Sequence, residues 1–201
     1  SAGDVNGDGL ADIIVGAYQI DTVYVIYGGP TSSFTDFDLS SVMLDYQTTG
    51  FKIKGEASGD SFGYAVSSAG DLNKDGYDDI VIGATKRESS RGAVYVIYGG
   101  EKSDLPDLDL SMNSLDPDTN GFRILGETAN DLFGYAVNPA GDINQDEYKD
   151  FIIGAFGKDG NKGVAYVVYG GEKADLRNID LSQQALQPLS TGFRILGNAA
   201  N

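Results

Sequence analysis

The amino-acid sequence predicts an all-β repeat protein, and two repeated features support this prediction. A nine-residue acidic segment occurs three times, and its copies begin 67 and 71 residues apart. Each copy is followed by a short run of β-branched and aromatic residues that ends in Gly-Ala. These runs are too short for helices and have the composition of buried strands. The acidic segments span residues 4–12, 71–79 and 142–150, and the runs span residues 13–17, 80–84 and 151–155.

Three further recurring segments bring the expected number of strands in each unit to four. Residues 23–29, 94–100 and 165–171 end in Gly-Gly, residues 50–55, 121–126 and 192–197 begin with Gly-Phe, and residues 62–66 and 133–137 begin with Phe-Gly. The Gly-Gly segments are apolar on both faces, which predicts strands covered on two sides. In residues 50–55, Phe51 and Ile53 alternate with Lys52 and Lys54, a period of two that predicts a half-exposed outer strand.

Four-stranded antiparallel units repeated at this period predict the blades of a β-propeller. We expect about three blades, in units 1–55, 56–126 and 127–197, with residues 198–201 starting the next unit. The first unit lacks its Phe-Gly strand, and three blades are too few for a ring of about four to eight. The remaining blades are therefore expected from a longer chain or from self-association, as in a six-bladed homodimer. A sandwich of Greek-key domains fits less well, because no unit has enough strands to close its own core.

Composition excludes several classes of function. The formal net charge of −16 argues against a nucleic-acid partner, which requires clustered Lys and Arg. The chain contains no Cys and no His, which excludes disulfides, Ser-His-Asp or Cys-His catalysis and imidazole zinc sites. No apolar run approaches the length of a membrane span.

The acidic segments have the residue pattern of calcium-binding loops. Oxygen-bearing side chains stand at alternate positions, and Ca²⁺ takes six to eight oxygen ligands. Carboxylates this close together repel one another unless a cation lies among them. The predicted ligands are the side chains of Asp4, Asn6, Asp8 and Asp12 with the carbonyl of Leu10, those of Asp71, Asn73, Asp75 and Asp79 with the carbonyl of Tyr77, and those of Asp142, Asn144, Asp146 and Asp150 with the carbonyl of Tyr148.

Two other interpretations of these loops remain. An Asp/Asn/Gly segment also forms ordinary hydrated turns without any ion. An EF-hand would need flanking helices and a Glu at the twelfth position, where this chain has Val15, Ile82 and Ile153. Glu147 replaces the glycine of the first two loops, so we expect the third site to be weaker. Because one hairpin supplies each whole ligand set, the three ions are expected to be structural.

The recurring Phe-Gly and Gly-Ala pairs resemble motifs of a known family. Phe62-Gly63 and Phe133-Gly134, followed by an acidic loop and Gly83-Ala84 or Gly154-Ala155, resemble the FG-GAP repeats of the integrin α-subunit propeller. The bacterial and protist FG-GAP proteins resemble the chain more closely still. The resemblance covers nearly the whole chain. It implies that each calcium loop joins the first two strands of a blade, that all loops lie on one rim, and that ligands dock on the opposite face.

Two classes of function are open to such a chain. The first is a non-catalytic, extracellular or cell-surface calcium-binding module for adhesion, protein interaction or structural assembly, which is not an enzyme. Its candidate contact residues lie in the variable loops Gln19–Thr22, Lys86–Arg91 and Phe156–Lys162, opposite the calcium loops. The second is the propeller part of a secreted hydrolase or phospholipase-like enzyme, or a glycan-binding module. The clustered acids are already assigned to metal, and most Tyr and Phe fall at core positions, so the first class is favoured.

Overall fold

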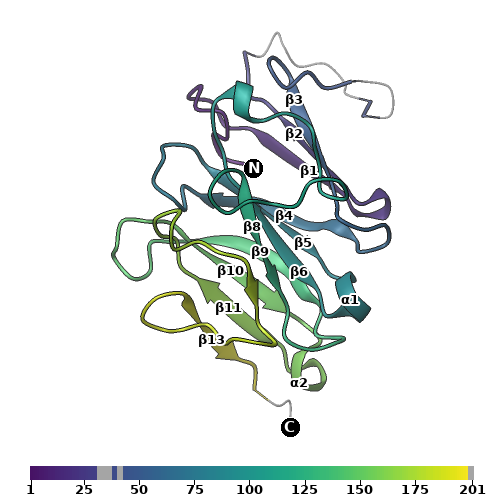
Figure 1. Ribbon diagram of the computed structural model, residues 1–201, viewed down its shortest axis with the longest axis vertical. Helices are drawn as coiled ribbons and strands as arrows, with labels where there is room; N and C mark the ends of the chain where they lie inside the picture. The colour runs from purple at the N-terminus through teal and green to yellow at the C-terminus, as the bar shows by residue number, and fades with distance from the viewer. Residues whose placement is uncertain (31–37, 40–42, 199–201) are drawn as a thin grey trace.

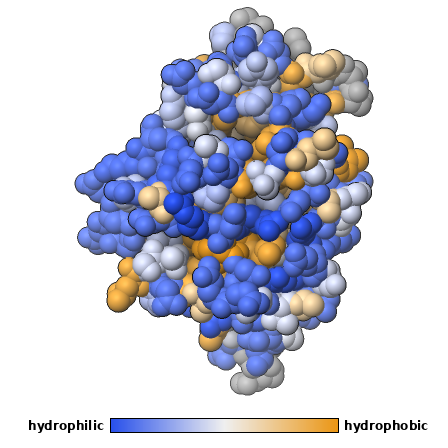
Figure 2. All heavy atoms as spheres, in the orientation of Figure 1, coloured by the Kyte–Doolittle hydropathy of each residue, from blue (hydrophilic) through white to orange (hydrophobic). Residues whose placement is uncertain are grey.

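The computed structural model describes residues 1–30, 38–39 and 43–198, and it confirms the predicted all-β, partial-propeller class (Figure 1). Three sheets follow one another along the long axis of the molecule, in the order of the sequence. Figure 2 shows that hydrophilic residues cover most of the visible face, with smaller hydrophobic areas between them. Within the described residues, no helix has the length and apolar character needed to cross a membrane.

Each sheet is built from strands that the sequence places in one repeat. The first contains β1 (Ile13–Ala17), β2 (Thr22–Ile26) and β3 (Gly50–Lys54); the second β4 (Phe62–Gly70), β5 (Asp79–Ala84), β6 (Ala93–Ile97) and β8 (Gly121–Leu125); the third β9 (Phe133–Gly141), β10 (Asp150–Ala155), β11 (Val164–Val168) and β13 (Gly192–Leu196). All neighbours among these strands are antiparallel. Within the described residues, the connections contain four short helical turns, η1 (Tyr18–Ile20), α1 (Arg87–Ser90), η3 (Lys102–Asp104) and α2 (Lys158–Asn161).

Two short strands that the sequence analysis did not predict join each sheet to the next. Strand β7 (Leu108–Asp109) runs parallel to β3 of the first sheet, and β12 (Ile179–Asp180) runs parallel to β8 of the second. Each crosses from its own repeat to the outer strand of the preceding sheet. The Nζ of Lys54 donates to Oδ2 of Asp109 over 3.0 Å at the first of these junctions. Consecutive blades are therefore connected at their outer edges through backbone pairing.

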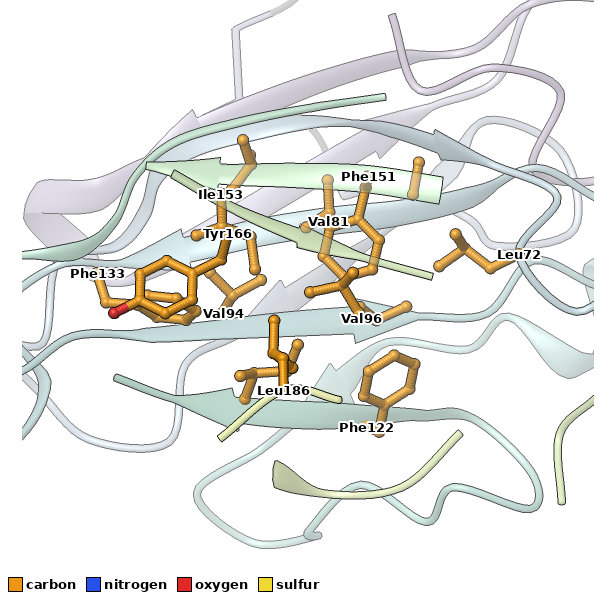
Figure 3. Close-up of a cluster of buried hydrophobic side chains, with 14 of the residues drawn as sticks. Leu72, Val81, Val94, Val96, Phe122, Phe133, Phe151, Ile153, Tyr166 and Leu186 are labelled. Carbon is orange, nitrogen blue, oxygen red and sulfur yellow. The ribbon is translucent and has the colours of Figure 1, made fainter. Parts of the chain in front are cut away.

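The core lies between the sheets, and the period of two in each strand decides which interface a residue enters. In β5, Ile80 and Ile82 belong to the cluster shared with the first sheet, whereas Val81 belongs to the cluster shared with the third. Figure 3 shows the second cluster, in which Val81 lies near Phe151 of β10. Phe51 and Ile53 of β3 are buried while Lys52 and Lys54 are exposed, as predicted.

A backbone close approach brings neighbouring sheets together. A Cβ on Gly83 of β5 would collide with the backbone carbonyl of Gly134 in β9, and Gly16 of β1 stands in the same relation to Gly63 of β4. At Gly154 of β10, the equivalent position in the third sheet, an added Cβ would lie 3.5 Å from its nearest neighbour, an ordinary contact. In the first two sheets, the Gly of the Gly-Ala pair therefore permits the following blade to pack closely.

Replacing this glycine should therefore have different effects at equivalent positions. We expect Gly83→Ala to lower the free energy of unfolding by about 1–3 kcal/mol, because the new methyl group must push the third sheet away. Gly154→Ala is the matched control and should change it by less than about 1 kcal/mol. Urea unfolding followed by circular dichroism measures both. Equal losses in the two variants would contradict the close-approach account.

Candidate metal centre

The three acidic loops lie along one edge of the stacked sheets, which we call the acidic edge. Consecutive loops touch: the amide of Asp78 donates to the carbonyl of Asp4 over 3.0 Å, and the amide of Lys149 donates to the carbonyl of Asp71 over 3.2 Å. The helical turns α1 and α2 lie at the other ends of the strands, which we call the opposite edge (Figure 1). The loops are therefore parts of one continuous structure.

All three loops share one conformation, which their first acidic side chain organises. In the first loop, the Asp4 carboxylate accepts hydrogen bonds from the amides four and five residues later, over 3.1 and 2.9 Å. Asp71 and Asp142 accept the equivalent pairs in their own loops, over 2.9–3.2 Å. The short polar side chains therefore hold the backbone in a tight turn, as Asp does in turns generally.

The last Asp of each loop is the most deeply buried predicted ligand. Asp79 is 0% exposed, and its two carboxylate oxygens accept hydrogen bonds from the amides of Leu72 and Gly99, each over 2.9 Å. Asp12 and Asp150 repeat both bonds, so this carboxylate connects the start of the loop to the first residue of the Gly-Gly turn. No cation pairs with Asp79 among the described residues.

Burial shifts the ionisation of these carboxyl groups. Removal from water raises the pKa of Asp79 well above its usual range, and the charges of Asp75 and Asp71 act in the same direction, against the two amide hydrogen bonds. Burial also raises the pKa of Asp12 and that of Asp150. A carboxylate in this position needs a positive partner in order to stay ionised at little cost in free energy.

The predicted ligands are close in sequence, but within the described part of the chain no three Asp or Glu side chains already form a metal cluster. In the first loop, Asn6 donates to both oxygens of Asp12 over 3.2 Å. In the second loop, the Nδ2 of Asn73 is buried and has no hydrogen-bond partner. The oxygen set of each loop fits a calcium site, in which the Asn side chain would offer its Oδ1 to the ion.

The third loop differs from the first two. Glu147 has a φ of 73°, in the left-handed region where Gly9 and Gly76 of the other loops lie at 84° and 92°. The position does require a positive φ, so a side chain there is strained. Ile143 is 44% exposed, whereas its counterpart Leu72 is fully buried beneath the next blade. The third loop is both more strained and more open.

Several residues of the predicted contact loops at the opposite edge form ion pairs with other residues of the chain. Arg87 pairs with Glu56 over 3.1 Å and with Asp60 over 2.9 Å. Lys158 is 8% exposed and pairs with Asp131 over 3.0 Å. Each cation binds the connection that leads from the preceding sheet into its own blade, so the prediction that these residues belong to a free contact surface is not supported for them.

A row of exposed aromatic rings, which the sequence analysis missed, crosses all three sheets. Tyr18, Tyr64, Tyr135 and Phe156, which we call the aromatic row, are each between 38% and 52% exposed. Their successive ring centroids are 5.5, 5.2 and 5.2 Å apart. Tyr64 and Tyr135 both follow a Phe-Gly pair, and Tyr18 and Phe156 both follow a Gly-Ala pair. The recurrence of an aromatic residue at these positions could have predicted the row from the sequence. It was missed because most Tyr and Phe were expected in the core.

Stacked antiparallel blades with a repeated acidic hairpin define a β-propeller-type repeat protein. The family profile described as FG-GAP repeat matches residues 1–26 and 62–97. The chain is similar to integrin alpha-8 of Gallus gallus (30% identity, covering 81% of this chain), integrin alpha-V of Gallus gallus (31%, 78%) and integrin alpha-PS5 of Drosophila melanogaster (30%, 78%). The chain therefore carries FG-GAP repeats, and the resemblance stated from the sequence is confirmed.

The similarity covers most of this chain but only a small part of its relatives. The matched region is 15% of integrin alpha-8, 14% of integrin alpha-V and 14% of integrin alpha-PS5. The similarity therefore concerns the repeat region and not the rest of these subunits.

The buried aspartate can be tested apart from any metal. In a calcium chelator, we expect Asp79→Ala to lower the free energy of unfolding by about 1–3 kcal/mol for each of the two amides that lose their acceptor. Asp79→Asn keeps one acceptor oxygen and should lose less. Chemical unfolding of both variants gives the comparison, and an alanine variant as stable as the asparagine variant would show that the amide bonds contribute little.

Proposed function

We propose that the chain is a calcium-stiffened propeller segment that serves adhesion or protein interaction and has no catalytic role. The observation that carries this proposal is the buried carboxylate at the end of each acidic loop, with no cation beside Asp79 among the described residues. A Ca²⁺ ion would supply the positive charge that the buried carboxylate of Asp79 lacks. The similarity to integrin α subunits supports the adhesion or protein-interaction part.

The proposed ligands are the fifteen residues predicted from the sequence, five in each loop. In every loop, the carboxylate of the first aspartate accepts the backbone amide four residues later and closes the same tight turn. Some of the carboxylate oxygens already accept hydrogen bonds from backbone amides, and these bonds fix the orientation of the carboxylates in the absence of an ion. The backbone turn is thus already formed, and the side chains must converge on the ion, which would then join the loop to the Gly-Gly turn through the closing Asp.

We further propose the division of the chain into units 1–55, 56–126 and 127–197, with residues 198–201 beginning another. The recurrence of the loop, the Gly-Ala pair and the Gly-Phe strand supports these boundaries. The remaining blades would come from a longer chain or from self-association. An extracellular or cell-surface location is proposed because extracellular modules bind calcium at its high external concentration, and because the relatives are integrin subunits.

A protein ligand is proposed to dock at the opposite edge, away from the acidic loops. The aromatic row supports this location, because protein interfaces are enriched in aromatic residues and these rings are exposed and in contact with one another. Ile20, which is 63% exposed, extends the apolar area beside Tyr18. Glycan binding at the same rings is the alternative, and a glycan array would distinguish the two ligand classes.

The alternative of a hydrolase is less well supported, because the grouped acids are committed to the loops. A screen with ester, phosphodiester and glycoside substrates should show no turnover by this chain. Hydrolysis abolished by substitution of a loop aspartate would contradict the non-catalytic proposal.

Calcium removal tests the proposal directly. A site filled at one hundred times its dissociation constant adds about 2.7 kcal/mol to stability, which for a chain of this size corresponds to a rise of roughly 5–10 °C in Tm. We therefore expect EGTA to lower Tm by at least this amount in differential scanning calorimetry. Excess Ca²⁺ should restore the original Tm, whereas Mg²⁺ should not. A Tm that neither treatment moves would sink the calcium proposal.

The third loop offers a matched exchange of residues. Glu147→Gly should relieve a strain of about 1 kcal/mol and raise the free energy of unfolding by about that amount, because the loop holds this positive φ without an ion. The reciprocal change Gly76→Glu should lower the free energy of unfolding by a similar amount, because that position has the same positive φ. Urea unfolding in EGTA measures both, and stabilities that do not respond in opposite directions would contradict the strain argument.

A further inference from the structure

A lysine from one blade reaches the acidic loop of the preceding blade, and the contact occurs twice at the same repeat position. The Nζ of Lys102 lies 3.1 Å from Oδ2 of Asp8. The Nζ of Lys173 lies 2.9 Å from Oδ2 of Asp75. Both lysines follow a Gly-Gly-Glu sequence, at the start of the connection that leaves the middle strand. The contact therefore belongs to the repeat and is not an isolated surface ion pair.

The ammonium groups occupy the carboxylate oxygen that a metal would need. Oδ1 of Asp8 accepts a hydrogen bond from the amide of Leu10 over 3.1 Å, and Oδ1 of Asp75 accepts one from the amide of Tyr77 over 3.2 Å. In each loop, Oδ2 of this aspartate is thus the oxygen left for a cation, and the lysine takes it. A Ca²⁺ ion and an ammonium group repel each other, so they compete for this oxygen.

Each lysine is also seated on an aromatic ring of the preceding blade. The Nζ atoms of Lys102 and Lys173 are 5.0 Å from the ring centroids of Tyr27 and Tyr98, within the range of cation–π attraction. Both rings are almost fully buried, at 5% and 3% exposed. The aromatic face holds the ammonium over the loop from one side while the aspartate holds it from the other.

We propose that Lys102 and Lys173 are built-in counter-cations, which neutralise the first two acidic loops and tie adjacent blades together until calcium displaces them. This inference rests on the proposed calcium-binding function and names how that site is regulated. Each lysine lowers the calcium affinity of the loop it enters and stabilises the metal-free form of that loop. Calcium binding at a loop therefore breaks the lysine contact between two blades, and loss of calcium restores that contact.

Other acidic residues share the surroundings of Lys173. Lys173 and Asp75 line a cavity of about 670 Å³, and Glu101 and Asp104 line the same cavity. An ammonium group released from Asp75 would therefore remain in an acidic cavity.

The third loop provides a comparison within the chain. Oδ2 of Asp146 accepts a hydrogen bond from Nδ2 of Asn144 over 2.7 Å, and no lysine pairs with Asp146 in the part of the chain that the structure describes. Substitutions of Lys102 and Lys173 should therefore leave calcium binding at this loop unchanged.

The test is calcium titration of the whole chain by isothermal titration calorimetry, with Lys102→Met, Lys173→Met and the double variant. Methionine keeps the length and the contact with the tyrosine ring but removes the charge. We expect each substitution to tighten one site about two- to fivefold, the size of effect that a partly exposed ion pair supports. In EGTA the same variants should have a lower Tm than the unaltered chain.

Two control variants separate this effect from a general loss of charge. Lys86→Met removes one positive charge at an exposed residue of the opposite edge, and should change neither the calcium affinity of the loops nor the EGTA Tm by a comparable amount. Lys173→Arg keeps the charge and should keep the weaker affinity. A merely structural role for the lysines predicts weaker calcium binding in the methionine variants, which is the opposite sign.

The outcomes distinguish this inference from the proposed function. Calcium binding that is unchanged or weaker in Lys102→Met and Lys173→Met, relative to Lys86→Met, overturns the inference while the calcium proposal stands. An unaltered chain that binds no calcium overturns both. Tighter binding in the two methionine variants, together with a lower Tm in EGTA, supports the displacement of lysine by calcium.

Discussion

The buried carboxylate that ends each acidic loop is the interaction on which the structure depends. Asp12, Asp79 and Asp150 each accept one amide from the start of their own loop and one from the Gly-Gly turn of the same blade. The second glycine of the next blade's turn then donates to the carbonyl of the loop, as Gly100 does to Val5 over 3.0 Å. One side chain therefore organises its own hairpin and presents a surface on which the following blade docks.

This arrangement explains why charge and packing cannot be separated in the chain. The sheets bury their apolar side chains against one another, so the hydrophobic core exists only between blades. The same interfaces carry the acidic loops at one end and the ion pairs of Glu56 and Glu127 at the other. A cation in a loop, whether ammonium or metal, stabilises an interface as well as a turn.

Much of the fold followed from the sequence because the information was repeated. Short runs of β-branched and aromatic residues predicted most of the strands, period-two alternation predicted the outer strand β3, and Gly-Ala and Gly-Gly marked strand ends. The crossing strands β7 and β12 were missed because each has two residues, too few to show a pattern. The ligand residues were identified as candidates from their spacing alone, but Lys102 and Lys173 lie 94 and 98 residues from the aspartates they reach, and such contacts depend on how blades stack. The aromatic row was missed for a related reason: Tyr and Phe are residue types usual in cores, and the contact of Tyr64, near the start of β4, with Tyr135 of β9 depends on how the second and third sheets pack.

The crossing of β7 onto β3 has a consequence for how such arrays can grow or be rearranged. The stretch that completes the outer margin of one blade is encoded within the next repeat, so a structural blade is out of phase with a sequence repeat. A duplicated or transplanted cassette cut at a blade boundary would leave its neighbour without that margin, whereas one cut at the repeat boundary carries it along. Lengthening such an array by whole repeats keeps each crossing strand beside the outer strand with which it pairs in the preceding sheet.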